Sequence, residues 1–160
     1  MAGADSPVLI AYDGSDLCKA AVRRAAELFP ARQAVVASIW EPGMAAMAIG
    51  PPEALGTGNI PPDPETVEMV DRAQREHASR VAAEGAELAK SLGLTAEPHS
   101  VPDDLDVADT LLEIARDRDA AVVVVGSHGL SGLRAHLLGG VSRKLLSRAD
   151  RPVLVIREAK

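Results

Sequence analysis

Two glycine-bearing turns hold the residues of this sequence that are best suited to chemistry. The first is Asp13-Gly14-Ser15, and the second runs from Gly126-Ser127-His128-Gly129 to Gly139-Gly140-Val141-Ser142. Glycine permits positive φ and lets backbone N–H groups approach an anion without a β-carbon in the way. The second cluster also precedes a predicted helix, whose free amides and dipole favour phosphate. Two groups of amides around one crevice would suit a polyphosphate.

Glycines can also serve only to end strands and cap helices, and a single glycine turn usually has that role. Two clusters beside one apolar strand favour the phosphate interpretation. Neither standard phosphate-binding fingerprint is present, because the chain has no G-x-x-x-x-G-K-[ST] loop and reads G-x-x-G-x-x-G instead of G-x-G-x-x-G. The hypothesis therefore depends on where the turns lie in the fold.

The elements that must position these turns alternate between short apolar runs and longer helical patterns, which is typical of a parallel sheet covered by helices. Strands are predicted at residues 8–11, 34–40, 95–101, 120–125 and 153–156. Helices are predicted from Ser15 to Leu28, from Asp63 until Gly93, after Asp106, and over residues 140–147. Ligands of such sheets bind beyond the carboxyl ends of the strands. The two turns would share one crevice if the first and fourth strands are neighbours.

Composition narrows the possible partners. The chain has 160 residues, a net charge of −6 and a pI near 5.2, so it lacks the basic footprint of a nucleic-acid-binding protein. Tyr12, Phe29 and Trp40 are its only aromatic residues, too few for a base-stacking platform. We expect one domain over residues 1–160, with a long flexible loop at residues 42–62 that is rich in proline and glycine.

Cysteine content, the first residues and the length of the apolar runs suggest a cellular compartment. Cys18 is the only cysteine, which excludes an internal disulfide and a cysteine-based zinc site, and we expect it to be a small buried residue. Residues 1–6 carry no Lys or Arg, unlike a secretory signal. The run at residues 120–125 is far too short to span a bilayer. A cytoplasmic protein without a membrane partner is the simplest expectation.

These motifs resemble the ATP-binding universal stress protein family. Gly126, Gly129 and Gly139, with nine residues between the last two, are similar to the family signature G-x2-G-x9-G-[ST]. The resemblance extends to the Asp13 turn, to Ile39-Trp40-Glu41-Pro42 and to the ending Arg151-Pro152-Val153-Leu154-Val155-Ile156. It implies an α/β fold of the adenine nucleotide α-hydrolase type, with a five-stranded parallel sheet of order 3-2-1-4-5 and about four helices on both faces.

For the adenosine part of ATP, the resemblance implies five contact residues. Asp13 would hydrogen-bond adenosine, and Ala11 and Tyr12 would lie beside the base. Ile39 and Val125 would enclose the adenine ring by apolar contact.

For the phosphates, the resemblance implies the glycine-rich residues. Gly126, His128 and Gly129 would line the ribose and α-phosphate. The β- and γ-phosphates would be held by Gly139, Gly140, Val141 and Ser142, with Mg²⁺ or Mn²⁺ bridging phosphate oxygens. The family pattern has Ser or Thr where this chain has Gly140, so one hydroxyl donor is missing. Because a hydrogen bond to a charged group contributes about 1.5–3 kcal/mol, affinity is expected to fall by about tenfold or somewhat more.

The leading functional hypothesis is a regulatory stress-response protein in which bound ATP changes the surface offered to an unidentified protein partner. A slow ATPase or phosphotransferase is an alternative, although the chain has no Walker lysine or evident base. An interaction module that binds no nucleotide is another, and a phospho-receiver domain is a fourth. His128 has no Ser-His-Asp spacing around it, so we expect no catalytic residue.

Two further sequence features bear on metals and assembly. Asp103, Asp104, Asp106 and Asp109 could suggest a metal site, but they lie at a helix start, where acids complement the dipole. Val153–Ile156 would form an uncovered edge of the sheet, which invites association. Because members of the family commonly pair through this strand, we expect a homodimer.

Overall fold

A parallel sheet positions the site. The structure is a computed structural model that describes residues 5–43, 63–103, 106–127 and 140–157. Its strands are β1 (Val8–Ala11), β2 (Gln33–Trp40), β3 (Thr95–Pro102), β4 (Val122–Gly126) and β5 (Val153–Ile156). Its helices are α1 (Asp16–Leu28), α3 (Pro64–Ser91), α4 (Val107–Asp117) and α5 (Gly140–Arg148).

The strand order is β3-β2-β1-β4-β5, which confirms the predicted sheet. Val8 of β1 pairs with Ala34 of β2 on one side and with Val122 of β4 on the other, both in parallel register. The first and fourth strands are therefore neighbours. The ends of β1 and β4 therefore lie side by side at the carboxyl edge of the sheet.

Side-chain caps begin three of the helices at the residues that the sequence predicts. Ser15 Oγ accepts a hydrogen bond from the Cys18 amide at 3.2 Å and starts α1. Asp63 accepts from the Thr66 amide at 3.0 Å and starts α3, whose first residue is a proline. Each cap supplies an acceptor for an amide that has no partner inside the helix.

Strand boundaries differ from the prediction by one or two residues in the second, third and fourth strands. β2 begins at Gln33 instead of residue 34. β3 contains Pro98, as predicted, and ends one residue later, at Pro102; it lies at the edge of the sheet, where a missing N–H is tolerated. β4 begins at Val122 instead of residue 120 and ends at Gly126. Every residue of β4 is buried, as its unbroken apolar run predicts.

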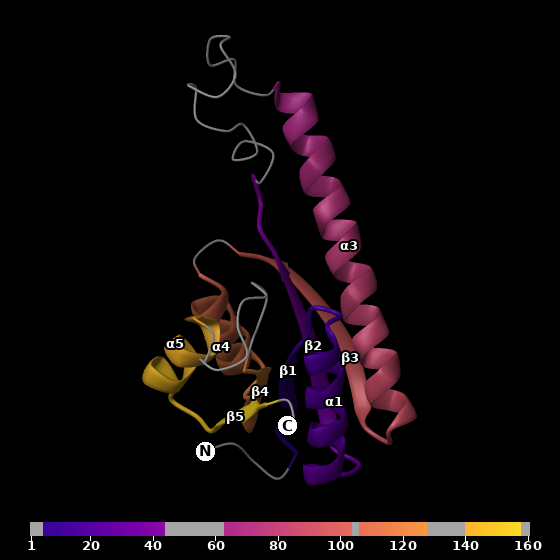
Figure 1. Cartoon of the computed structure of the whole chain (residues 1–160), viewed down its shortest axis with the longest axis vertical. Helices are drawn as coiled ribbons and strands as arrows, with labels where there is room; N and C mark the ends of the chain where they lie inside the picture. The colour runs from indigo at the N-terminus through magenta and orange to yellow at the C-terminus, as the bar shows by residue number, and fades with distance from the viewer. Residues whose placement is uncertain (1–4, 44–62, 104–105, 128–139, 158–160) are drawn as a thin grey trace.

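Two layers of helices cover the two faces of the sheet (Figure 1). α1 and α3 lie on one face with the cluster that contains Val8, Ile10 and Tyr12. α4 and α5 lie on the other face with the cluster that contains Leu9 and Val125. Alternate residues of the central strands thus point to opposite layers. Helix α3 extends well past the sheet, and its buried residues are Ala78, Ala82, Gly85, Ala86 and Ala89.

At Gly85 the backbone of α3 lies very close to the sheet. A β-carbon built there would come within 2.7 Å of the Tyr12 ring and 2.8 Å of Val36. Only glycine allows the helix backbone to approach these side chains so closely. Although α3 is long, neither it nor any other helix in the described ranges has an apolar stretch that could span a membrane.

Candidate functional site

A small pocket opens at the carboxyl edge of the sheet, where β1, β2 and β4 end. Apolar side chains from both helical layers contribute to its wall. The lining residues are Ala11, Tyr12, Asp13, Cys18, Ala37, Ile39, Leu111, Val125, Gly126 and Val141. The pocket therefore lies at the crevice that the topology predicts for a ligand.

Most of the predicted site residues that the structure describes lie in this wall. They are Ala11, Tyr12, Asp13, Ile39, Val125, Gly126 and Val141. Gly140 and Ser142 flank Val141 in the first turn of α5 but are not part of the lining. His128, Gly129 and Gly139 lie outside the described residues.

Three lining residues were not among the predicted contacts. Ala37 lies two positions before Ile39 on β2, so strand alternation places both on the same face of the sheet. Leu111 belongs to the buried stripe of α4. The periodicity of the sequence could therefore have indicated both residues. Cys18 is buried, as predicted, and burial raises the pKa of its thiol to about 11. The thiol is therefore neutral at physiological pH.

Asp13 shapes the turn that enters α1. Its Oδ1 accepts a hydrogen bond from the Ser15 amide at 2.9 Å. Gly14 between them has a φ of +82°, a conformation that disfavours residues with a β-carbon. The Asp13 carboxylate thus stabilises the turn and also borders the pocket.

Tyr12 borders the pocket, but its hydroxyl points to helix α3. The hydroxyl donates a hydrogen bond to Glu84 Oε1 of α3 at 3.0 Å, and the side chain belongs to the cluster under α1 and α3. Burial and the nearby Glu84 carboxylate raise the pKa of the phenol far above its ordinary value. The Tyr12 amide donates to the Ala37 carbonyl at 2.8 Å, which extends the pairing of β1 and β2 to the pocket.

The first turn of α5 faces the same edge of the sheet. A β-carbon at Gly140 would meet no atom of the described residues within 4 Å. Ser142 is buried, and its hydroxyl donates to the Ser127 carbonyl at 3.3 Å, which links α5 to the end of β4. Free amides at a helix N-terminus and the helix dipole favour an anion here.

The close approach of α1 to the end of β4 explains a second glycine. A β-carbon at Gly126 would lie 2.9 Å from Leu17 Cγ of α1. The first glycine of the signature is thus required by helix packing, whatever it contacts in a ligand.

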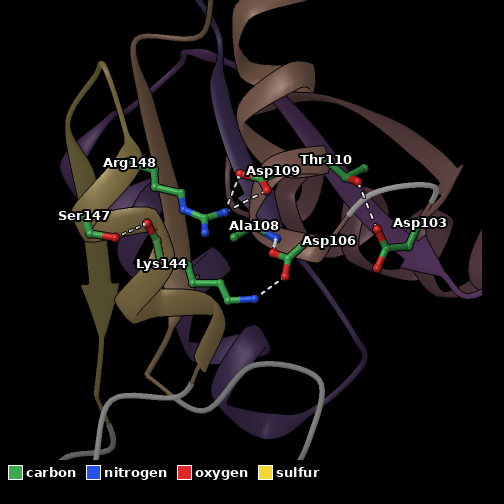
Figure 2. A network of polar contacts seen from close by, with 8 residues as sticks. All are labelled: Asp103, Asp106, Ala108, Asp109, Thr110, Lys144, Ser147 and Arg148. Carbon is green, nitrogen blue, oxygen red and sulfur yellow. Dashed lines mark hydrogen bonds and ion pairs between the residues drawn. The ribbon is translucent and has the colours of Figure 1, made fainter.

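Polar contacts between α4 and α5 use the acids at the start of α4 (Figure 2). Asp106 caps α4 by accepting from the Ala108 amide at 3.0 Å, and its other oxygen pairs with Lys144 of α5. One turn further, Asp109 pairs with Arg148 at 2.7 Å. Asp103 accepts from the Thr110 hydroxyl at 3.1 Å. The three described acids therefore cap helix α4 or contact polar side chains. Asp104 lies outside the described residues.

A metal site assembled from side chains alone is not found in the part of the chain that the structure describes. No three His, Cys, Asp or Glu residues of these ranges come together as metal ligands. The polar groups near the pocket are main-chain N–H donors, hydroxyl groups and the Asp13 carboxylate, which accepts hydrogen bonds, and they are suited to a polar organic ligand carrying phosphate.

Comparisons with known proteins agree with this architecture. YxiE of Bacillus subtilis, a universal stress protein, is 28% identical over 150 residues, covering 94% of this chain and 97% of the relative. The structure of MJ0577 of Methanocaldococcus jannaschii superposes with a TM-score of 0.74 at 16% identity over 98% of both chains, which shows a shared fold. A universal stress protein in complex with cAMP has a TM-score of 0.62 at 25% identity over 97% of this chain and 98% of that one.

The sequence model of the universal stress protein family matches residues 6–157, which is nearly the full length of the sequence given. Topology, the strand-end turns and this match agree. The chain belongs to the universal stress protein family.

Proposed function

We propose that this chain binds an adenine nucleotide, with ATP as the principal ligand, in the pocket at the carboxyl edge. The arrangement of three neighbouring strand ends carries the proposal. Ile39 on β2 and Val125 on β4 stand on either side of β1, whose end leads to Asp13. Apolar side chains on two sides and one carboxylate suit a flat base with polar edges. The family member in complex with cAMP supports this ligand class.

The phosphates would extend toward the first turn of α5. Gly140, Val141 and Ser142 belong to that turn, and Val141 also lines the pocket, so a ligand that fills the pocket lies within reach of the helix N-terminus. Because the described residues gather no cluster of metal ligands, Mg²⁺ or Mn²⁺ would be carried by the phosphate oxygens.

We assign the nucleotide a regulatory role in a cytoplasmic stress response, in which occupancy changes the conformation and the surface presented to a protein partner. Binding, and not rapid turnover, is the function. Turnover of ATP faster than about one per second would contradict this role, because that rate is near the low end for kinases. The chain would act as a homodimer paired through β5, whose residues are only half-buried at the edge of the sheet.

Calorimetric titration with ATP and Mg²⁺ tests the binding proposal. Ile39→Asp places a charge in the apolar wall, so we expect it to weaken ATP binding at least about tenfold, as an unpaired charge in an apolar site is costly. Leu92→Asp is the matched control: Leu92 is 41% exposed at the far end of α3, and its variant should bind as the wild type does. Absence of heat with the wild type, or equal binding by Ile39→Asp, would overturn the proposal.

The mass in solution tests the homodimer separately. Light scattering at micromolar concentration should give twice the 16.7 kDa of the chain. Val155→Lys places a charge on β5 and should yield the monomeric mass. A monomeric mass for the wild type would contradict the homodimer and would not affect the proposal of nucleotide binding.

A further inference from the structure

We propose that the Asp106–Lys144 ion pair sets how strongly the pocket prefers ligands with several phosphates, because Lys144 neutralises a carboxylate that would otherwise repel them. The inference rests on the proposed function and goes beyond it: it assigns charge selectivity to two side chains outside the pocket lining and outside the glycine signature.

The position of the pair follows from the two helices that carry it. Leu111 of α4 and Val141 of α5 both line the pocket. Asp106 lies five residues before Leu111, which is about 7.5 Å nearer to the carboxyl edge along the helix axis. Lys144 lies about one turn after Gly140, the first residue of α5. Figure 2 shows the lysine reaching across to the start of α4. The pair thus joins the first turns of the two helices on the side of the carboxyl edge, where the pocket opens.

The charge at Asp106 is permanent at neutral pH. Its hydrogen bond with Lys144 lowers the pKa of the carboxyl below its ordinary value. One oxygen is used as the cap of α4, so the carboxylate cannot turn away from this edge without leaving the Ala108 amide. A fixed negative charge near phosphates is repulsive, more so at low salt. Lys144 cancels that repulsion.

A second ion pair between the same helices allows the effect of charge on the ligand to be distinguished from the effect on helix packing. Arg148 and Asp109 also join α5 to α4, but each lies about one turn further from the carboxyl edge. Loss of either pair would weaken the contact between the helices by a similar amount. Only loss of Lys144 exposes a carboxylate on the side where the pocket opens.

The experiment compares an uncharged with a charged ligand. Calorimetry at low salt measures adenosine and Mg²⁺-ATP on the wild type, Lys144→Gln, Asp106→Asn and the double variant. We expect Lys144→Gln to weaken ATP binding about two- to fivefold, the range of an exposed charge pair, and to leave adenosine binding unchanged. Asp106→Asn retains the cap without the charge, so the double variant should recover wild-type ATP affinity.

Two control variants complete the test. Lys90 pairs with Glu87 at the opposite edge of the sheet and is 47% exposed, compared with 46% for Lys144, so Lys90→Gln should leave both affinities unchanged. Arg148→Gln should change ATP affinity less than Lys144→Gln does.

Equal loss of adenosine and ATP affinity in Lys144→Gln, or a double variant as weak as Lys144→Gln, would overturn charge selectivity and leave Lys144 as a helix-positioning residue. Failure of the wild type to bind either ligand would overturn the proposed function itself. Normal binding by the wild type with no change in Lys144→Gln would overturn only this inference.

Discussion

Both helical layers pack on the sheet through apolar side chains, but they differ in the space around their glycines. In the α1–α3 layer, a β-carbon at Gly85 would lie 2.7 Å from the Tyr12 ring. In the α4–α5 layer, two exposed ion pairs join the helices to each other, and a β-carbon at Gly140 would meet no described residue within 4 Å. Close packing tolerates little change of volume, whereas exposed ion pairs contribute little to stability.

The two layers also contribute differently to the pocket. Residues of the α4–α5 layer supply Leu111 and Val141 to the pocket and bring the α5 N-terminus to its rim. The α1–α3 layer holds β1 and Tyr12 in place, next to Asp13. Substitutions should therefore affect stability most in the first layer described and ligand binding most in the other.

The largest loss of stability is expected for Gly85→Ala. The added methyl group would collide with the Tyr12 ring and with Val36, both in the core, so we expect a loss of about 1–3 kcal/mol in the free energy of unfolding. Urea denaturation measures it. A variant as stable as the wild type would mean that α3 can move away from the sheet at no cost.

Removal of the α4 cap should have the next largest effect. Asp106→Ala loses the hydrogen bond to the Ala108 amide, which we expect to cost about 0.5–2 kcal/mol at neutral pH. Asp106→Asn retains the cap and should cost less.

The contribution of the Asp106 charge should also depend on pH. The pKa of this carboxyl is lowered in the folded state, chiefly by its hydrogen bond with Lys144. Its stabilisation is fully present above the ordinary pKa of 3.8 and is lost as pH falls through the lower, folded pKa. Unfolding curves from neutral pH to below pH about 3 should therefore show the difference between wild type and Asp106→Asn shrinking. A constant difference would contradict the ion pair.

Tyr12→Phe should have a moderate effect in the α1–α3 layer. It removes the hydroxyl that donates to Glu84 and preserves the ring, so about 0.5–1.5 kcal/mol should be lost. Glu84 is half exposed and can be solvated by water, which keeps the cost low. Thermal unfolding measures the change, and a loss as large as that of Gly85→Ala would show that the hydroxyl, not the ring, secures α3.

The smallest effect on stability is expected for Gly140→Ser. No described residue lies within 4 Å of the new β-carbon, so the free energy of unfolding should change by less than about 0.5 kcal/mol. The same substitution restores the hydroxyl of the family pattern, and ATP affinity should rise about tenfold if that hydroxyl meets phosphate. Calorimetry beside urea denaturation separates the two quantities. A large loss of stability here would remove the contrast between the layers.

Much of the fold could be predicted because local signals and topology agree. Ser15, Asp63 and Asp106 are capping residues at the starts that the structure shows, and β1 and β5 have the predicted bounds. The third strand was predicted through Pro98 and is confirmed, but the local sequence does not show that β3 lies at the sheet edge, where a proline is tolerated. That position is a property of the whole chain.

The candidate site was predictable in a different way. Strand-end positions such as Ala11 and Val125 follow from the parallel sheet, and the structure brings them to one pocket. The direction of the Tyr12 hydroxyl toward Glu84 was not predictable, because it depends on a contact between residues 72 positions apart. The Lys144–Asp106 pair was missed for the same reason: the sequence shows an acid at one helix start and a lysine in another helix, with no sign that they meet.

The geometry of α3 has a mechanical consequence. The helix packs closely on the sheet at Gly85, while the stretch before Ala78 has no buried residue and meets the end of β2 through surface contacts. Asp71 accepts a hydrogen bond from the Gly43 amide, and Arg75 lies over the Trp40 ring. Pro64 lies 21 residues from Gly85, or about 32 Å along the axis. A tilt of about one degree at Gly85 would therefore move Pro64 by roughly half an ångström, and the surface contacts of Asp71 and Arg75 would have to yield.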